Sequence, residues 1–231
     1  MTRQLLKGIR VLDFTDFLAG PYCGMYLADM GADVIKVENL TTGGNFVRNA
    51  RPLEKNSGLS MYFQNLNRNK RGVAINLKTE DGKKLFSELV KSADVLLENN
   101  RPGVMGRLGF SYEECKKLNP RLVYASISGF GQYGPNANRP GYDLIGQAMG
   151  GSMSITGWPG GSPTRSGTAI GVPSSAVTVN IRSNKLSSFF SEKSSAAPMH
   201  RKPKKKLKSF PIRSSDSSER SRSRNSAFAT G

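Results

Sequence analysis

The stretch IRVLDF at residues 9–14 has the length and apolar content of a buried strand, and ADVIKV at residues 32–37 has the same character. Gly20 and Pro21, which follow the first stretch, permit a tight turn and a helix start. A helical pattern then runs to about Met30. A strand, a helix and a second strand in this order form the repeating unit of a parallel sheet, so the sequence predicts an α/β fold.

The same alternation continues outward from these two strands. Further strands are expected at residues 72–77, 95–98 and 122–128. One helix is expected after its N-cap at Thr79, and another after the capping box at residues 111–114. Residues 39–59 form a long mixed loop, and the glycine-rich residues 150–171 end a crossover or build an active-site loop. The expected architecture is a doubly wound, mostly parallel, Rossmann-like sheet.

The composition of the chain changes abruptly after Gly171. Of the 25 glycines only Gly231 lies beyond this point, whereas 13 of the 34 Lys and Arg residues and only three of the 17 acidic residues do. We therefore predict a folded domain at residues 1–171 and a low-complexity, basic, Ser/Lys/Arg-rich, disordered tail at residues 172–231. Most of the net charge of +17 lies in this tail, so the charge does not indicate a nucleic-acid partner for the domain.

The sequence indicates a cytoplasmic protein. Its two cysteines, Cys23 and Cys115, are too few for a disulfide framework or a zinc site, and the single His200 lies in the tail. We interpret both cysteines as helix packing residues and expect no metal. The basic N-terminus is followed by no apolar segment of signal-peptide length, and no run is long enough to cross a membrane, so no membrane partner is expected.

Four loops follow predicted strands at their carboxyl ends, where open α/β sheets bind ligands. These loops are residues 15–21, 38–44, 98–103 and 129–143. Because loops and helix N-termini at such an edge offer free N–H groups to anions, we expect a phosphate-bearing ligand there. The domain has neither a G-x-G-x-x-G motif after its first strand nor a Walker loop, so these patterns do not name the ligand.

A set of motifs in the sequence resembles the pattern of a known protein family. The motifs are LKGIRVLDF with AGP at residues 6–21, GADVIKVE at 31–38, NRNKRG at 67–72, ADVLLEN at 93–99, GFGQYGP at 129–135 and RPGYD at 139–143. In this order and spacing they closely resemble the class III CoA-transferase family, also called the CaiB/BaiF type. That family includes formyl-CoA transferase, carnitine and bile-acid CoA-transferases and the related α-methylacyl-CoA racemases. The resemblance covers roughly residues 5–171.

The resemblance implies coenzyme A or acyl-CoA as a substrate, a carboxylic acid as the acceptor, and a set of CoA-binding residues. Leu18 and Ala19 resemble the family's segment against the CoA nucleotide. The stretch from Ile75 to Lys78 resembles the part that holds the adenine and its phosphate. The loop after the strand at residues 95–98 matches the family's CoA-contacting loop at Asn99, Asn100, Arg101 and Arg107.

Three of these positions have a second interpretation. Asn39 stands where formyl-CoA transferase has an arginine on the phosphate, which weakens that contact or moves it to another cation. Lys78 and Arg107 suit the phosphates of CoA, which favour ammonium, guanidinium and backbone N–H donors. The alternative for both is a solvated surface charge.

Tyr142 and Asp143 are expected to line the substrate site. In the racemase branch a histidine stands where this chain has Tyr142. A tyrosine titrates near pH ~10 and is a poor general base at neutrality, so a transferase is favoured over an acyl-CoA racemase. The alternative for Tyr142 is a packed aromatic whose hydroxyl has a partner.

The resemblance places the family's nucleophile at Val172. Family members attack the acyl-CoA thioester with an aspartate that follows a small-residue run, and here SGTAIG at residues 166–171 precedes valine. Valine cannot perform this chemistry, so no catalytic residue is assigned and a truncated or frameshifted, inactive form is expected. The alternative is a real replacement tail. Full-length relatives form interlocked homodimers, and the loss of their distal domain would remove much of that contact.

Three functional hypotheses follow. The first is the CoA-binding portion of a class III CoA-transferase that does not itself turn over. The second is a non-catalytic CoA-binding or interaction module whose basic tail docks on an anionic partner. The third retains activity through Asp143 as a substitute carboxylate.

Overall fold

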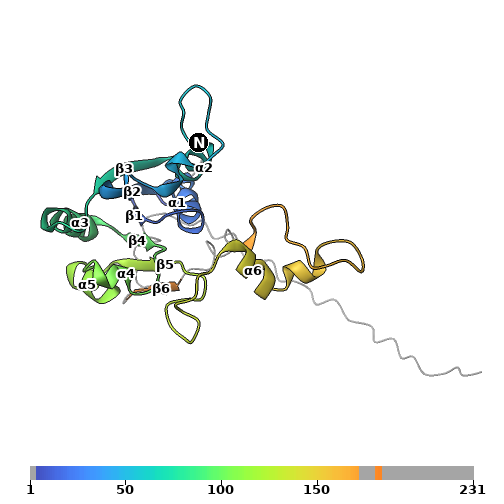
Figure 1. Cartoon of the computed structure of the whole chain (residues 1–231). Helices are drawn as coiled ribbons and strands as arrows, with labels where there is room; N and C mark the ends of the chain where they lie inside the picture. The colour runs from blue at the N-terminus through green and yellow to red at the C-terminus, as the bar shows by residue number, and fades with distance from the viewer. Residues whose placement is uncertain (1–3, 172–179, 184–231) are drawn as a thin grey trace, which may run out of the picture.

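The computed structural model of the protein describes residues 4–171 and 180–183. Its centre is a six-stranded sheet with the order β3-β2-β1-β4-β5-β6 (Figure 1). Neighbouring strands are parallel except for β5 and β6, which are antiparallel. The strands are β1 (Arg10–Phe14), β2 (Asp33–Asn39), β3 (Lys70–Ile75), β4 (Val95–Glu98), β5 (Val123–Ser126) and β6 (Asn180–Arg182). The expected α/β fold with a mostly parallel sheet is confirmed.

Helices cover both faces of the sheet, as a doubly wound fold requires (Figure 1). The helices are α1 (Ala19–Asp29), α2 (Met61–Asn67), α3 (Glu80–Ser92), α4 (Val104–Arg107), α5 (Tyr112–Leu118) and α6 (Asp143–Met149). Short 3-10 helices lie at Leu40–Thr42, Phe46–Asn49 and Ser152–Ile155. α1 and α2 contact each other on one face, while α3 and α5 contact each other on the opposite face.

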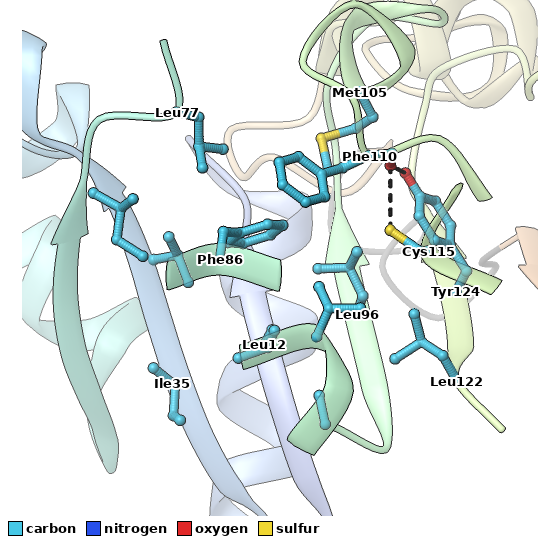
Figure 2. Packing of buried hydrophobic residues seen from close by; sticks show 14 residues of the cluster. Leu12, Ile35, Leu77, Phe86, Leu96, Met105, Phe110, Cys115, Leu122 and Tyr124 are labelled. Atoms are coloured by element: carbon cyan, nitrogen blue, oxygen red, sulfur yellow. Dashed lines mark hydrogen bonds between the residues drawn. The ribbon is translucent and has the colours of Figure 1, made fainter. Parts of the chain in front are cut away.

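Alternate residues of the strands build two separate cores. On the face beneath α3 and α5, Leu12 of β1 belongs to a large cluster centred on Phe86 and Phe110, whose rings lie 4.6 Å apart (Figure 2). Figure 2 also shows the Phe110 carbonyl accepting hydrogen bonds from the Tyr124 hydroxyl at 3.1 Å and from the Cys115 thiol at 3.5 Å. On the face beneath α1, the cluster consists of smaller residues: Ile9, Val11, Ala19, Ala28, Ala32, Val34, Leu97, Ala125 and Ile127.

The starts of α3 and α5 agree with the signals in the sequence. The Thr79 hydroxyl accepts the N–H of Gly82 at 3.2 Å and caps α3, and Ser111 with Glu114 forms the capping box of α5. The two cysteines pack as expected, since Cys115 of α5 is fully buried and Cys23 of α1 is partly buried. Burial raises the pKa of Cys115 to about 12 and that of Cys23 to about 11, so neither thiol ionises at neutral pH.

Some element boundaries differ from the prediction. β3 begins at Lys70, two residues before the expected strand, and α1 begins at Ala19, so Pro21 is its third residue rather than its first. The helix α2 lies just after the expected loop at residues 39–59, and its N-cap Ser60 accepts the N–H of Phe63. The sequence pattern predicted neither α2 nor α4, because both are too short to show a helical period.

The last described strand comes from the segment that the sequence assigns to the tail. β6 pairs antiparallel with β5, with Ala125 opposite Ile181. Arg182 lies over the ring of Tyr112, 5.9 Å from its centroid. Part of the expected disordered tail is therefore the edge strand of the sheet, while Val172 and residues 184–231 lie outside the described part of the chain.

After β5 the chain leaves the sheet. Residues 129–171, including α6, extend away from the helices that cover the two faces (Figure 1). Ile155 and Trp158 in this extension are 88% and 89% exposed, which is unusual for such large apolar side chains. The extension therefore has no apolar core of the kind that holds the sheet together.

Candidate functional site

The structure has a cavity of about 450 Å³ at the carboxyl ends of β1, β4 and β5. Although β1 and β4 are far apart in sequence, they are neighbours in the sheet. The connection after β1 turns to one face through α1 and the connection after β4 turns to the other, so the loops separate there. Ligands of open α/β sheets bind at such a switch point.

Three of the four predicted loops meet in this cavity. Of the predicted site residues, the cavity is lined by Leu18, Ala19, Asn99, Asn100, Arg101, Tyr142 and Asp143. Leu18 and Ala19 form the start of α1, whose N-terminus has no side-chain cap. Because the first N–H groups of a helix lack intrahelical partners, this helix end offers donors to an anion.

The other predicted positions lie outside the cavity. Asn39 uses its side-chain oxygen to accept the N–H of Thr41 at 3.0 Å. Ile75 is 3% exposed and packs in the core beneath α3, so its side chain is structural. Lys78 is exposed before α3, and Arg107 is exposed in the last turn of α4. β2 and β3 lie on the far side of β1 from β4, which separates Asn39, Ile75 and Lys78 from the cavity.

Asn99 holds two walls of the cavity together. Its side-chain oxygen accepts the backbone N–H of Asp16 at 2.8 Å, and its side-chain nitrogen donates to the Asp16 carbonyl at 2.7 Å. Both bonds join the loop after β4 to the loop after β1. The Asn99 amide is thus engaged by protein backbone, whereas the neighbouring Arg101 is exposed at the cavity.

Glu98 supports the same loop from below. Its carboxylate is 3% exposed and accepts the Asn100 N–H at 2.8 Å. Burial raises the pKa of Glu98, and hydrogen bonds from Ser126 and Asn100 only partly oppose that effect. The carboxylate therefore fixes the backbone next to Arg101 while it lies behind the cavity wall.

Phe17 and Arg139 also line the cavity, and sequence reasoning did not assign them to the site. The guanidinium of Arg139 lies 5.7 Å from the centre of the Phe130 ring and brings a second cation to the cavity beside Arg101. Its position in the RPGYD motif was the available signal. Phe17 has a φ of 61°, and its ring lies 5.5 Å from that of Phe46.

Two backbone segments cross at the foot of the loop at residues 129–141. A Cβ atom on Gly129 would lie 2.3 Å from the Cα of Gly141, so no side chain fits between them. Both glycines also line a second cavity of about 130 Å³, together with Tyr142 and Gly171. The two cavities therefore share one wall.

Gly171, which directly precedes Val172 in the sequence, lies against the first turn of α6. A Cβ on Gly171 would lie 3.0 Å from the Asp143 carbonyl oxygen. Gln147 holds this region together, because its side-chain nitrogen donates to the Asp143 carboxylate at 2.5 Å and its side-chain oxygen accepts the Ser166 N–H at 3.0 Å. Asp143 is thus a positioned carboxylate beside Tyr142 at the cavity.

The described residues contain no cluster of three or more His, Cys, Asp or Glu side chains that could bind a metal ion. Nor is any helix in the described part of the chain both long enough and apolar enough to span a bilayer. The chemistry of the cavity comes from two guanidinium groups, one carboxylate, a helix N-terminus and an apolar lining.

Comparison with known proteins identifies the family. The sequence profile of CoA-transferase family III matches residues 6–181, which is most of the chain. The chain belongs to CoA-transferase family III. The match continues ten residues beyond Gly171 and ends within β6, so the family pattern extends past the point where the composition changes.

Curated relatives of this CoA-transferase family III chain carry transferase names. It is 51% identical over 160 residues to an acetyl-CoA:oxalate CoA-transferase of Acetobacter aceti, an alignment that covers 69% of this chain and 40% of that protein. It is 44% identical to a succinyl-CoA:glutarate CoA-transferase of Mus musculus, covering 71% of this chain and 37% of that protein. The chain thus spans less than half the length of each of these relatives.

Solved structures show the same fold. A CAIB/BAIF family protein from Brucella suis is 38% identical, with a TM-score of 0.66 over 74% of this chain and 49% of that chain. The protein Rv3272 from Mycobacterium tuberculosis is 39% identical, with a TM-score of 0.67 over 75% of this chain and 47% of that chain. The domain is therefore the CaiB/BaiF fold of CoA-transferase family III.

Proposed function

We propose that this domain binds the CoA part of an acyl-CoA thioester in the cavity at the carboxyl ends of β1, β4 and β5. The observation that carries the proposal is the convergence of Arg101, Arg139 and the uncapped start of α1 on one cavity. CoA carries a diphosphate and a 3′-phosphate, and these groups bind to guanidinium forks and to free N–H groups. The apolar part of the lining suits the pantetheine arm.

The transferase names of the relatives support acyl-CoA and a carboxylic acid as the substrate classes. In the family an aspartate attacks the thioester carbonyl, and CoA leaves as a thiolate. A carboxylate suits this step because it is an anion at neutral pH and becomes a leaving group when CoA returns. The resemblance puts Val172 at that position in this sequence. We propose that the chain binds acyl-CoA but does not form a covalent intermediate at residue 172.

Asp143 does not replace the missing nucleophile in this proposal. Its carboxylate accepts the Gln147 amide at 2.5 Å, which fixes it in the first turn of α6. A nucleophile must approach the thioester carbon from above the plane of its carbonyl group, and a displacement of about 1 Å can lower the rate on the order of a hundredfold. The position of Asp143 suits the binding of substrate rather than its covalent capture.

Titration of CoA into the whole chain tests the binding site. We expect Arg101→Ala and Arg139→Ala each to weaken CoA binding by about tenfold, the scale of one charge-assisted hydrogen bond. Lys84→Ala removes a cation that is 78% exposed on α3 and should leave the affinity unchanged. Lys78 lies outside the cavity, so Lys78→Ala should leave the affinity unchanged if CoA binds in the cavity. A weaker affinity in this variant would place a phosphate of CoA at Lys78 instead. Unchanged affinity in both arginine variants would refute the proposed site.

Hydroxylamine trapping tests the chemical step. The chain is mixed with an acyl-CoA and hydroxylamine, and its intact mass is then measured. We expect no adduct, because valine supplies no nucleophilic atom. An adduct that disappears in Asp143→Asn would show that the chain forms a covalent intermediate by the alternative route.

A further inference from the structure

A cluster of buried charges lies directly below the segment that begins the cavity wall. Asp13 of β1 is fully buried, and the side chains of Lys36 on β2 and Lys70 on β3 are 2% and 1% exposed. The Asp13 carboxylate lies 2.7 Å from the Lys70 ammonium and 3.4 Å from the Lys36 ammonium. Two cations from neighbouring strands thus share one carboxylate on the face beneath α1.

Each ammonium also holds one backbone carbonyl. Lys36 Nζ donates to the Thr15 carbonyl, which also accepts the Asn45 side-chain amide at 3.4 Å. Lys70 Nζ donates to the Pro21 carbonyl at 2.8 Å. Thr15 and Pro21 stand on either side of residues 16–20, the segment that contains Phe17, Leu18 and Ala19. The cluster therefore forms hydrogen bonds at both ends of the segment that lines the cavity.

This segment needs such support because its backbone conformation is costly. Phe17 has a φ of 61°, in the left-handed region that non-glycine residues rarely adopt. A strained residue of this kind persists when surrounding contacts fix it. The Asn99 amide fixes Asp16 from the side of β4, so Lys36 and Lys70 supply the contacts from below.

The segment and α1 also pass so close to the cluster that no extra atom fits. A Cβ on Gly24 of α1 would lie 2.5 Å from the Asp13 carboxylate and 3.2 Å from the Lys70 ammonium. A Cβ on Gly20 would lie 2.3 Å from the Thr15 side chain. Among the described residues, every buried side-chain nitrogen and oxygen has a hydrogen-bond partner, so the cluster is fully satisfied.

The pair of lysines holds the charged form of Asp13. Full burial acts to raise the pKa of Asp13, but the charges of Lys36 and Lys70 and hydrogen bonds from Lys70 and Thr15 bring it below its usual range. Breaking a buried ion pair by removing one partner is costly because a charge is left alone. The cluster contains two cations and one anion, so loss of either lysine leaves one matched pair.

We propose that Asp13, Lys36 and Lys70 form a positioning cluster, which fixes residues 16–20 in the conformation that binds CoA by holding the Thr15 and Pro21 carbonyls. The proposal rests on the cavity being the CoA site, as proposed above. The cluster does not touch the ligand. Its role is to present the N-terminus of α1 to the phosphate groups without the cost of ordering the loop at the moment of binding.

Lys36→Met and a matched control on the same strand test the proposal. Lys36→Met leaves the Asp13–Lys70 pair intact and removes the Lys36 contacts with Asp13 and with the carbonyl and hydroxyl of Thr15. Val34→Ala lies two residues earlier on the same face of β2, is 1% exposed, and removes core packing without removing a hydrogen bond to residues 15–21. Hydrogen exchange of the ligand-free protein, followed by mass spectrometry of the peptide spanning residues 15–22, reads the conformation. CoA titration reads the function.

We expect Lys36→Met to raise exchange in that peptide and to weaken CoA binding, each by about tenfold, the scale of one hydrogen bond from a charged group. Val34→Ala should lower the overall stability but change neither the exchange of the peptide spanning residues 15–22 nor the affinity for CoA. Unchanged exchange in Lys36→Met overturns the positioning role whether or not CoA binds. Faster exchange with unchanged CoA affinity overturns its link to binding.

Two further arms keep the outcomes distinct. If wild-type protein does not bind CoA, the proposed function fails, and the exchange data still decide whether the cluster positions the segment. If Lys36→Met does not fold, Lys70→Met replaces it, since this change leaves the Asp13–Lys36 pair and releases the Pro21 carbonyl. Faster exchange at the Pro21 end of the peptide then supports the proposal, and unchanged exchange overturns it.

Discussion

The two faces of the sheet differ in chemistry although the same strands build both. Beneath α3 and α5 the face is apolar and aromatic, centred on Phe86 and Phe110 (Figure 2). Beneath α1 the face consists of small apolar residues that give way to Asp13, Lys36 and Lys70.

This difference follows the period of two in a strand, because Leu12 and Asp13 are neighbours in sequence but point to opposite faces. One face therefore stabilises the fold with a large apolar core, and Glu98 is a buried carboxylate at the end of a strand on that face. The other uses part of its buried area for charges that hold the loop at the cavity. Mutations on the two faces should therefore have different effects on the exchange of the loop at the cavity.

The largest expected effect is on the apolar face. Phe86→Ala should lower the free energy of unfolding by about 3–5 kcal/mol, because a fully buried ring leaves a cavity among the rings of Phe14 and Phe110. Leu85→Ala on the same helix is the control, since Leu85 is 49% exposed. Urea unfolding measures both. Equal effects of the two substitutions would contradict the assignment of Phe86 to the buried apolar face.

Asp13→Asn tests the charged face. It should lower the free energy of unfolding by about 3 kcal/mol, because two buried ammonium groups lose their shared counter-charge. Unlike Phe86→Ala, this change should also raise hydrogen exchange in residues 15–22 while leaving exchange in α3 unchanged. The comparison fails if Asp13→Asn is as stable as wild type.

The pH dependence of stability should also differ between the faces. The pKa of Asp13 is below its ordinary value of 3.8, so the stability from its charged form is complete above 3.8 and is lost as pH falls below that value through the folded-state pKa. The pKa of Glu98 on the other face is raised above its ordinary 4.5, so stability is lost as pH rises from 4.5 through the folded-state pKa.

Two variants separate these contributions. Urea unfolding across the acid range should show a flatter loss below pH 3.8 in Asp13→Asn and a smaller loss above pH 4.5 in Glu98→Gln. If both variants follow the wild-type curve, neither carboxyl group titrates as the structure indicates.

The smallest expected effect is at a helix end that touches neither charge cluster nor cavity. Thr79→Ala should cost about 1 kcal/mol of unfolding free energy, because the N–H of Gly82 loses its acceptor. Thr79→Ser keeps the hydroxyl and should restore most of this stability. Neither change should affect exchange in residues 15–22, and an effect there would show that the two faces are coupled.

The strands of the fold were largely predictable because they are short apolar runs with clear ends. β4 has the predicted bounds, and β1, β2 and β5 lie close to theirs. β3 began two residues early because Lys70 and Arg71 resemble loop residues in the sequence. Their charges are paired in the structure, Lys70 with Asp13 and Arg71 with Asp33, and such long-range partners leave no local signal.

The candidate site was predictable at the level of strand ends. The sequence indicated which loops follow strands, and Leu18, Asn99 and Tyr142 do line the cavity. It could not give the order of strands in the sheet, which separates Asn39 and Lys78 from the others. Arg139 was missed because the sequence does not show that the loop carrying it folds back onto the end of β5.

The crossing of Gly129 and Gly141 has a consequence for protein engineering. The backbones of Gly129 and Gly141 meet at the foot of the loop. The residues between them therefore form a loop with closely spaced ends, and these ends cannot move apart without breaking that contact. The tip, where Tyr133 is 77% exposed, lies outside both cavities. Insertions at the tip should therefore be tolerated with little change at the foot. The loop offers a place to graft a tag or a recognition peptide beside the cavity.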